Sequence, residues 1–291
     1  MAEDGLRLAK HHGAGNDFLV LLDPDGNRPL SGSEARALCD RHRGVGADGV
    51  LRATRPDPSQ TQAVLCMELR NADGSPAEMS GNGIRCFVQA AVRAGWVEPG
   101  LVPVATVAGL RTVDYRESAT PGLAHAAVAM GEAALGPEEP VAAVPGARVA
   151  RFVDLGNPHL VVLGEPVDDA VVAALGPALS RRHGAGANVE FVWAGGLPGD
   201  LRLRVWERGV GETQACGTGA CAAVAAAASW GLVADRATVH SPGGVLEVTL
   251  SGDGIVLAGP TQHVADVVVA EDELAAMAAG PDPVLEVTTR S

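Results

Sequence analysis

SGNGIRCFVQAAVRAGWV (residues 80–97) and CGTGACAAVAAAASWGLV (residues 216–233) align without a gap, 136 positions apart. Both stretches open on a GxG motif and reach a second glycine at the same point, after a run rich in alanine and valine. A glycine that follows such a run is typical of a helix C-cap. We therefore predict two helices, over about 82–94 and 218–230, each ended by its glycine.

This internal repeat has an offset of nearly half the 291-residue chain, so it predicts two similar halves. Each half would hold one of the helices with strands around it, although two unrelated amphipathic helices could also give such a pattern. We expect one half at 1–119 together with a strand returning at 263–275, and the other half at 120–262. A linker is expected at 115–125, and residues 276–291 would form a tail.

Short apolar or alternating runs surround the two helices, as is typical of strands. In LRLRVW (201–206), alternate residues are apolar, which predicts a strand with one buried face. Additional strands are expected at 18–22, 62–69, 101–107, 151–155, 159–163, 188–193, 237–240 and 265–270. Shorter helices are expected after Ser33 and over 167–182. The predicted fold class is α/β, of the α+β type, with two pseudo-symmetric halves that each wrap a mixed or antiparallel β-structure around a central helix.

Composition excludes several classes of function. The 22 Lys and Arg against 35 Asp and Glu give a formal charge of −13, which argues against a nucleic-acid binder. The five cysteines show no CxxC spacing, so neither a disulfide scaffold nor a metal site is expected. The N-terminus lacks a secretory pattern, and the longest apolar stretch, 216–230, is shorter than the ~20 residues that cross a bilayer. We expect a cytoplasmic protein that binds neither membrane nor nucleic acid.

The GxG motifs predict a binding site for an anion. Glycines at the start of a helix let backbone N–H groups and the positive end of the helix dipole face a negative group. Neither copy continues as a phosphate-binding loop or as a dinucleotide fingerprint. Two copies, one from each half, could hold a single small carboxylate between two helix ends.

Cys216 directly precedes the second GxG motif. A thiol at a helix N-terminus is expected to have a lowered pKa, which would make it a usable base or nucleophile, although most cysteines of this kind are small buried residues. The equivalent residue of the first half is Ser80, for which an N-cap is the ordinary role. The other cysteines lie within predicted helices or strands, where a packing role is expected: Cys39, Cys66, Cys86 and Cys221.

Polar residues also gather at predicted turns. Taken alone, the asparagines of these turns could be ordinary turn residues, His159 a surface histidine, and Glu207 with Arg208 a solvated ion pair. Taken together and in order, the segments closely resemble the diaminopimelate epimerase family over about residues 6–270. They are HGAGNDF (12–18), RNADGSPAEMSGNGIRC (70–86), LGNPH (155–159), RVWERGVGETQACGTGA (204–220) and SPGGVLEV (241–248).

The resemblance implies a cofactor-independent epimerase that interconverts LL- and meso-diaminopimelate in lysine and peptidoglycan precursor synthesis, with a homodimer as a common state. It implies that one thiolate removes the Cα proton while a thiol on the opposite face returns one. Catalytic positions would be Cys216, Ser80, His159 and Glu207. The distal end of the substrate would be held by Asn16, Asn71, Asn188 and Arg208, with Glu207 for a distal ammonium. The α-carboxylate would be held by Gly81, Asn82, Gly217 and Thr218, and Asn157 would lie beside the reacting centre with His159 and Glu207.

Two residues depart from the family pattern. Position 80, where the pattern has its first catalytic cysteine, is Ser80, and position 49, where many members carry glutamine, is Gly49. Cys86 lies about 1.7 helical turns beyond Ser80, so it is too far along the helix to replace the missing thiol.

Ser80 allows three explanations: an introduced cysteine-to-serine substitution, a natural variant with reduced or redirected activity, or a serine activated by its helix end. A dehydratase or racemase of a hydroxyproline-like amino acid that uses Cys216 alone is therefore an alternative. A cysteine hydrolase, with Cys216 as nucleophile and His159 as base, is a third.

Overall fold

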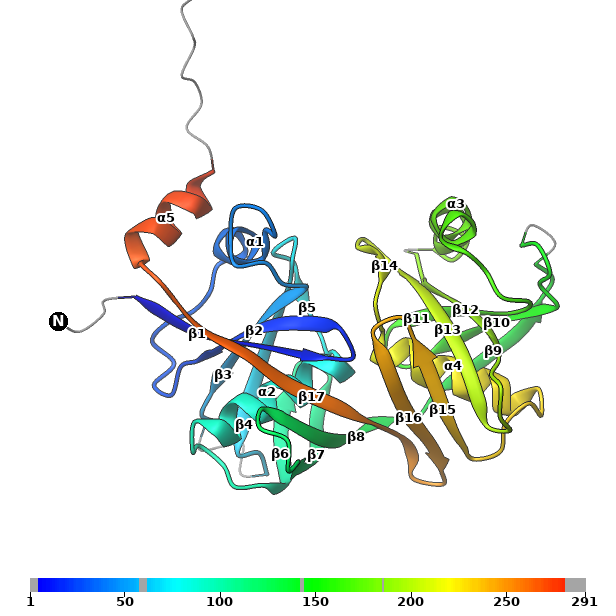
Figure 1. The fold of residues 1–291 in the computed structure, drawn as a ribbon, viewed down its shortest axis with the longest axis horizontal. Helices are drawn as coiled ribbons and strands as arrows, with labels where there is room; N and C mark the ends of the chain where they lie inside the picture. Colours follow the sequence, from blue (N-terminus) through cyan, green and yellow to red (C-terminus); the bar gives the residue numbers. More distant parts are fainter. Residues whose placement is uncertain (1–4, 58–61, 142–143, 185, 281–291) are drawn as a thin grey trace, which may run out of the picture.

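The computed structural model describes residues 5–57, 62–141, 144–184 and 186–280, and within them the chain forms two lobes. Each lobe is built around one long helix that strands surround (Figure 1). All strands of the described residues are linked by hydrogen-bonded pairing into one continuous sheet that serves both lobes. The predicted fold class is confirmed.

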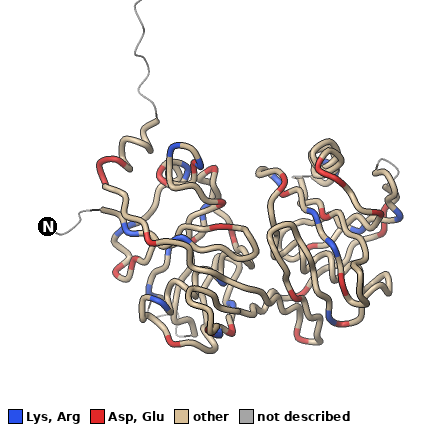
Figure 2. Tube along the Cα trace, in the orientation of Figure 1, with Lys and Arg blue, Asp and Glu red and all other residues tan. Residues whose placement is uncertain are grey.

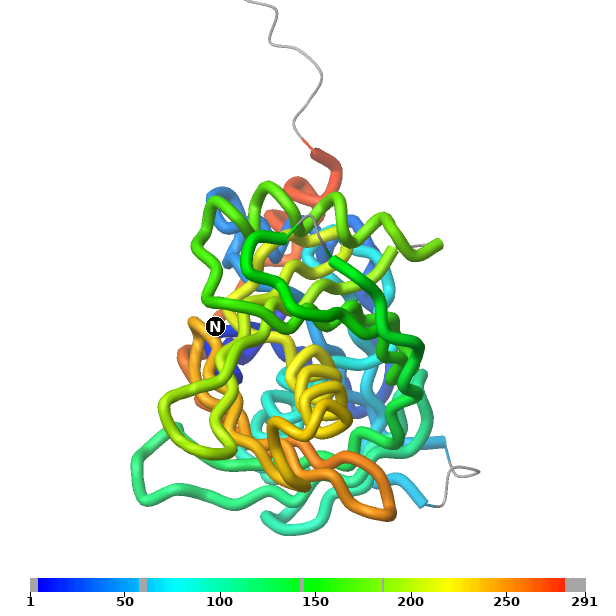
Figure 3. Tube along the Cα trace, turned by 90° about the vertical axis from the view of Figure 1, so that its right-hand side faces the viewer, coloured from blue at the N-terminus to red at the C-terminus, as the bar shows by residue number. Residues whose placement is uncertain are grey.

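The first lobe surrounds helix α2 (Gly81–Arg93). Its strands are β1 (Leu6–Gly13), β2 (Asn16–Leu22), β3 (Gly49–Thr54), β4 (Leu65–Asn71), β5 (Pro76–Ala77), β6 (Gly100–Thr106) and β7 (Gly109–Glu117). The second lobe surrounds helix α4 (Gly217–Ser229), as Figure 3 shows in the view along that helix. Its strands are β9 (Ala134–Glu139), β10 (Val149–Asp154), β11 (Pro158–Leu163), β12 (Asn188–Ala194), β13 (Asp200–Glu207), β14 (Gly211–Thr213), β15 (Arg236–Ser241) and β16 (Gly244–Ser251).

Two long strands, β8 (Leu123–Gly131) and β17 (Gly254–Val269), run antiparallel between the lobes. The first part of β17 pairs with β16 of the second lobe, and its last part pairs with β1 of the first lobe. The expected linker at 115–125 is wrong, because β7 and β8 pair there as a hairpin. The strand expected to return at 263–275 ends at Val269, and helix α5 (Glu271–Ala279) follows it. The division of the chain at 119/120 stays a prediction, and the end of the expected tail, 281–291, lies outside the described residues.

The two central helices follow the repeat closely. Ser80 and Cys216 are their N-cap residues, and each side chain accepts a hydrogen bond from the glycine three positions on. Gly95 and Gly231 both have φ of +71°, the left-handed conformation in which glycine ends a helix. The first eleven residues of each helix are buried.

The shorter helices cover the outer faces of the sheet. Helix α1 (Gly32–Cys39) begins two residues earlier than expected, because Ser31 and Glu34 form a capping box there. Helix α1 packs with α5 over β1, β2 and β3, where both contribute to one apolar cluster. Helix α3 (Asp169–Ser180), close to the predicted 167–182, packs on β13. Figure 2 shows acidic and basic residues interspersed along both lobes. In the described part of the chain, no helix is both long and apolar enough to span a membrane.

Candidate functional site

The N-termini of the two central helices meet between the lobes. A Cβ atom placed on Gly217 would lie 3.2 Å from the Cα of Gly81 and 2.9 Å from the Cδ2 of Leu257. A Cβ placed on Gly81 would lie 2.6 Å from the same Leu257 atom. The close approach therefore requires glycine on both sides, which explains the paired GxG motifs. The positive ends of two helix dipoles thereby face one small volume.

A cavity of about 100 Å³ lies at this meeting point. Ser80 and Cys216, the two N-cap residues, both line it. The remaining lining residues come from both lobes: Asn16, Phe18, Asp48, Leu69, Asn71, Ala77, Met79, Gly81, Asn157, Glu207, Val210, Thr213, Gly217 and Thr218. The structure thus brings together most of the residues predicted for the site.

Strand pairing shows that the two lobes supply their site residues from equivalent places. In the first lobe, Phe18 of β2 pairs with Gly49 of the parallel strand β3. In the second, His159 of β11 pairs with Asn188 of the parallel strand β12. The antiparallel strand that follows places Asn71 opposite Gly49 in the first lobe. In the second lobe it places Trp206 opposite Val189, the residues next to Glu207 and Asn188. The equivalent pairs are Asn16/Asn157, Phe18/His159, Gly49/Asn188, Asn71/Glu207 and Ser80/Cys216.

Cys216 is buried in a polar setting. Its Sγ lies 3.4 Å from the amide nitrogen of Gly219, which donates to it, and 3.4 Å from the Oγ1 of Thr218. The expectation of a lowered pKa is wrong for this structure. Burial raises the pKa of the thiol well above its ordinary value, and the nearby carboxylates of Glu207 and Glu190 add to the rise. Cys216 is therefore held as a neutral thiol, ready to donate a proton.

A chain of hydrogen bonds extends from Cys216 to a buried carboxylate. The Nδ2 of Asn157 donates to Thr218 Oγ1 at 3.2 Å, so the Oδ1 of Asn157 accepts from His159 Nε2 at 3.1 Å. The Nδ1 of His159 lies 2.7 Å from Glu190 Oε1, and neither side chain is exposed. Because both ring nitrogens bond to other residues, His159 does not contact Cys216. The nucleophile–base pair of a cysteine hydrolase is therefore not formed.

Glu207 is the second carboxylate near the thiol. Its Oε1 accepts a hydrogen bond from Thr213 Oγ1. Burial raises the pKa of Glu207 to about 7, and the charges of Asp48 and Glu190 act in the same direction. A cationic group that entered the cavity would favour the ionised form of Glu207.

The first lobe offers no comparable chemistry beside Ser80. Its hydroxyl oxygen accepts from the amide of Gly83 at 3.0 Å, as an ordinary N-cap does. Where His159 stands in the second lobe, the first lobe has the ring of Phe18. A Cβ on Gly49 would lie 2.7 Å from the carbonyl oxygen of Arg70 and 3.2 Å from the Phe18 ring, so a side chain there would require a shift of its neighbours.

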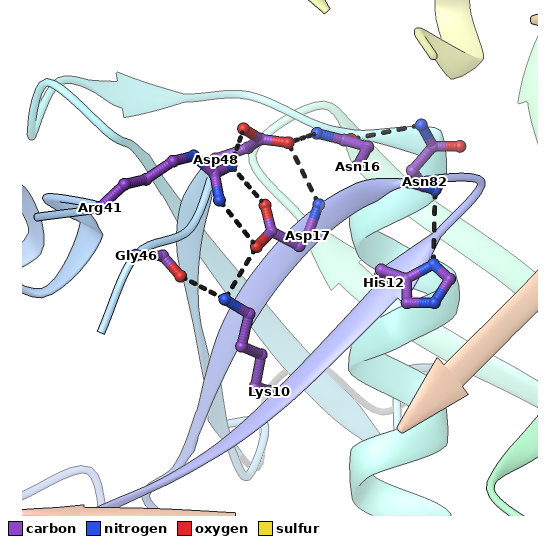
Figure 4. A network of polar contacts seen from close by, with 9 residues as sticks. Lys10, His12, Asn16, Asp17, Arg41, Gly46, Asp48 and Asn82 are labelled. Atoms are coloured by element: carbon purple, nitrogen blue, oxygen red, sulfur yellow. Dashed lines mark hydrogen bonds and ion pairs between the residues drawn. The ribbon is translucent and has the colours of Figure 1, made fainter. Parts of the chain in front are cut away.

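A polar network supports the other wall of the cavity (Figure 4). Asn16 donates to Asp48 at 2.7 Å and accepts from Asn82 at 3.2 Å. Arg41 pairs with both Asp48 and Asp17 at 2.7 Å. These contacts fix the amide of Asn16, and they place Asn82 behind the cavity wall rather than on it.

Four predicted residues do not line the cavity: Asn82, His159, Asn188 and Arg208. Arg208 lies in a separate surface pocket beside α3, where its Nη1 donates to the carbonyl oxygen of Gly186 at 3.3 Å. Asn188 accepts from the backbone amide of Arg208 at 2.9 Å, so it holds the β13–β14 turn. Their predicted contacts with the distal end of a substrate stay predictions.

Residues that the sequence reasoning missed include Asp48, Thr213 and Glu190. The sequence could have indicated Glu190 as a site residue, because it is a charged residue in the middle of the apolar run NVEFVW (188–193). Cys86 and Cys221 do not line the cavity, and burial raises their pKa values to about 11 and about 12. The described residues contain no group of three or more His, Cys, Asp or Glu side chains placed to hold a metal ion.

Comparisons with solved structures show the fold. A probable proline racemase from Agrobacterium radiobacter aligns with a TM-score of 0.73 at 19% identity, covering 94% of this chain and 96% of that one. A hydroxyproline epimerase from Agrobacterium vitis aligns with a TM-score of 0.69 at 17% identity, covering 93% and 94%.

Sequence comparisons show more similar relatives than the structural comparisons do. The sequence model of diaminopimelate epimerase matches residues 8–136 and 151–264. The diaminopimelate epimerase of Mycolicibacterium paratuberculosis is 39% identical over 289 residues, which cover 92% of this chain and 98% of the relative. That of Thermobifida fusca is 40% identical over 276 residues, covering 90% and 97%. The match spans both lobes and every cavity residue, and the chain belongs to the diaminopimelate epimerase family.

Proposed function

We propose that this chain is an isomerase that interconverts LL- and meso-diaminopimelate by proton transfer at Cα, without a cofactor. The observation that carries the proposal is the cavity at which two helix N-termini meet, lined by Ser80 from one lobe and Cys216 from the other. Inversion of a stereocentre requires a proton donor or acceptor on each face of Cα. Two lobes that meet at one cavity supply two such faces.

The substrate α-carboxylate would bind between the two helix ends, near Gly81 and Gly217. Removal of the Cα proton drives electron density into that carboxylate, and preorganised backbone donors stabilise the developing charge. This stabilisation of the developing charge lowers the barrier most when water is excluded from the site. Asn157 and Thr218, which are held in the hydrogen-bonded chain, would border the reacting carbon on the Cys216 side.

On its own face of Cα, Cys216 serves as both acid and base. As a neutral thiol it donates its proton to the carbanion, so that the C–H bond forms as the S–H bond breaks. For the reverse step it must first lose a proton. A substrate ammonium near Glu207 would offset the negative charge that keeps the thiol protonated, and so would lower the pKa of Cys216 when substrate is bound.

The other face is chemically weaker. A serine hydroxyl can return a proton only by forming an alkoxide, which is far less stable than a thiolate, and no imidazole or carboxylate of the described residues bonds to Ser80. We therefore propose a one-sided enzyme. Hydrogen exchange through Cys216 proceeds for one stereoisomer, while full inversion is slow.

Incubation with LL- and meso-diaminopimelate in deuterium oxide tests the function. Deuterium at Cα of one isomer, with only a slow change of configuration, is the expected result, and alkylation of Cys216 should abolish it. Loss of exchange from both isomers, even after Ser80→Cys, would rule out the epimerase. Persistence of exchange after alkylation would rule out the role of Cys216.

Ser80 also supports a second candidate, a dehydratase or racemase of a hydroxyproline-like amino acid that acts through Cys216 alone. The fold is shared with a hydroxyproline epimerase, but the sequence identity of about 40% lies with diaminopimelate epimerases. Release of a keto or imino product from hydroxyproline, with diaminopimelate inert, would decide for this candidate.

We further propose that the enzyme acts in the cytoplasm. No cysteine of the described chain forms a disulfide, and a catalytic thiol such as Cys216 persists best in a reducing compartment.

A further inference from the structure

Arg85 is a fully buried cation without a carboxylate partner. None of its surface is exposed, and it extends from the first turns of α2. Its Nη1 donates to the carbonyl oxygen of Gly81 at 2.9 Å and its Nη2 to the Oδ1 of Asn82 at 2.8 Å, while its Nε has no partner. No described residue places a carboxylate within ion-pair distance of the guanidinium. An uncompensated buried charge is costly, so its retention calls for a physical reason.

The fold encloses this guanidinium tightly. A Cβ on Gly13 of β1 would lie 3.1 Å from Arg85 Nη2, and one on Gly259 of β17 would lie 3.3 Å from the same atom. Both strands therefore have a glycine, which has no side chain, where they lie against the guanidinium. Burial lowers the pKa of Arg85 to about 10, so the side chain still carries its charge at neutral pH.

The charge lies directly behind the anion site. Gly81, whose carbonyl Arg85 binds, lines the cavity. Asn82, the other acceptor, connects Arg85 to two further groups. Its Nδ2 donates to Asn16 Oδ1 at 3.2 Å and to the Ala215 carbonyl at 3.2 Å. Through the side-chain amide of Asn82, Arg85 is therefore linked to Asn16, a cavity residue of its own lobe, and to Ala215, which precedes Cys216.

The second lobe has no such cation at the matching position. The residue equivalent to Arg85 in α4 is Cys221, which is buried and neutral. The first turn of α4 instead packs against a carboxylate, since a Cβ on Gly219 would lie 2.7 Å from Glu190 Oε1. At the equivalent Gly83 the neighbour is the ring of Phe18, at 3.3 Å. An anion between the two helix ends thus has the guanidinium behind the α2 side, whereas the carboxylate behind the α4 side is paired with His159.

We propose that Arg85 is a positioning residue whose buried charge makes the N-terminus of α2 the stronger anchor for the substrate α-carboxylate. The inference rests on the proposed function, because it assigns the missing counter-charge to the substrate of that cavity. The bound carboxylate balances the guanidinium, and Asn82 carries the orientation from one to the other. Arg85 does not touch the substrate.

Calorimetric titration with LL- and meso-diaminopimelate tests this role in the full-length protein and its variants. Arg85→Met, which keeps the volume and removes the charge, should weaken binding at least about tenfold. Arg85→Lys, which keeps the charge, should stay within about threefold. Cys221→Ala, the matched change in α4, should leave binding unchanged. If Arg85→Met does not fold, Arg85→Gln takes its place.

A second readout separates this role from simple packing. Because Arg85→Met removes an uncompensated charge, its unfolding midpoint without ligand should not fall by more than a few degrees, while its KM rises more than its kcat falls. Unchanged affinity in Arg85→Met would overturn the inference, and so would an affinity in Arg85→Lys as weak as in Arg85→Met.

The outcomes also separate this inference from the proposed function. The same titrations are made with L-lysine, L-glutamate and L-proline. A wild-type protein that binds one of these but neither diaminopimelate isomer overturns the proposed function alone, and the Arg85 variants are then judged with that amino acid. A wild-type protein that binds no amino-acid carboxylate overturns both.

Discussion

Gly81 and Gly217 face each other so closely that a Cβ on Gly217 would come within 3.2 Å of the Gly81 Cα. The two residues begin the two central helices, and Ser80 and Cys216 directly precede them. One contact between glycines therefore sets both the distance between the helix dipoles and the separation of the two N-cap side chains.

Gly217→Ala should disturb both the fold and the site. The added methyl group would lie 2.9 Å from Leu257 Cδ2 and 3.2 Å from the Gly81 Cα, so the helix ends must move apart. We expect a loss of about 1–3 kcal/mol in the free energy of unfolding, measured with urea, and a KM at least about tenfold higher. Gly196→Ala, at a position with open space around it, should change neither. An unchanged KM in Gly217→Ala would show that the close approach is not needed for binding.

Glu207 should impose a pH dependence on activity. Its raised pKa of about 7 means that the carboxylate that binds the substrate ammonium forms as the pH rises through neutrality. The kcat/KM for exchange should therefore rise between about pH 6 and 8, since this ratio reports the free enzyme. Glu207→Gln should remove that rise. It should also lower the pKa of Cys216, because a neighbouring negative charge is gone, and alkylation of the thiol should then begin at lower pH. A pH profile unaltered by Glu207→Gln would exclude this role.

The buried carboxylate of Glu190 should matter for the Cys216 face alone. Glu190→Leu places there the residue type that the equivalent position of the first lobe, Leu51, already has. With no acceptor for its Nδ1, His159 should no longer hold Asn157 and Thr218 in place. We expect exchange through Cys216 to fall about 10- to 100-fold. Glu190→Gln, which can still bond to His159, should lose less. If both variants lose activity equally, the charge rather than the hydrogen bond is the cause.

His11 should make the fold sensitive to acid. Burial lowers the pKa of His11 from 6.5 to about 4, and its Nδ1 bonds to Gln89 at 2.9 Å. The unfolded chain therefore binds the proton first. This destabilises the folded state as the pH falls from about 6.5 toward 4, by up to roughly 3 kcal/mol, and has no effect above that range. Urea unfolding at pH 7.5 and pH 5 should show a smaller difference in His11→Gln than in the wild-type protein. His42→Gln, at an exposed histidine, is the control and should behave like wild type.

Features set by neighbouring residues could be predicted from the sequence. The helices at α2 and α4 follow from a cap, an apolar run and a glycine, all within 18 positions. In β13, Leu201, Leu203 and Val205 are buried, as their alternation indicates. The paired GxG motifs predict, for the same reason, the two helix N-termini that meet at the cavity.

Features that depend on residues far apart in the sequence could not be predicted from it. Strand β17 links both lobes because its pairing changes from β16 to β1 along its length, and no local pattern encodes that change. The pKa of Cys216 is raised rather than lowered because burial and carboxylates on β12 and β13 outweigh the helix end, which only the folded arrangement reveals. The same holds for Arg85, whose isolation depends on glycines in β1 and β17.

The most direct test of the account compares solvent deuterium exchange at Cα for LL- and meso-diaminopimelate, with Ser80 in place and in Ser80→Cys. With Ser80, we predict exchange from one isomer only and slow inversion. Ser80→Cys should give exchange from both isomers and raise the rate of inversion by at least about 100-fold, because a thiol then acts on each face. Equal exchange rates from both isomers with Ser80 in place would contradict the one-sided mechanism.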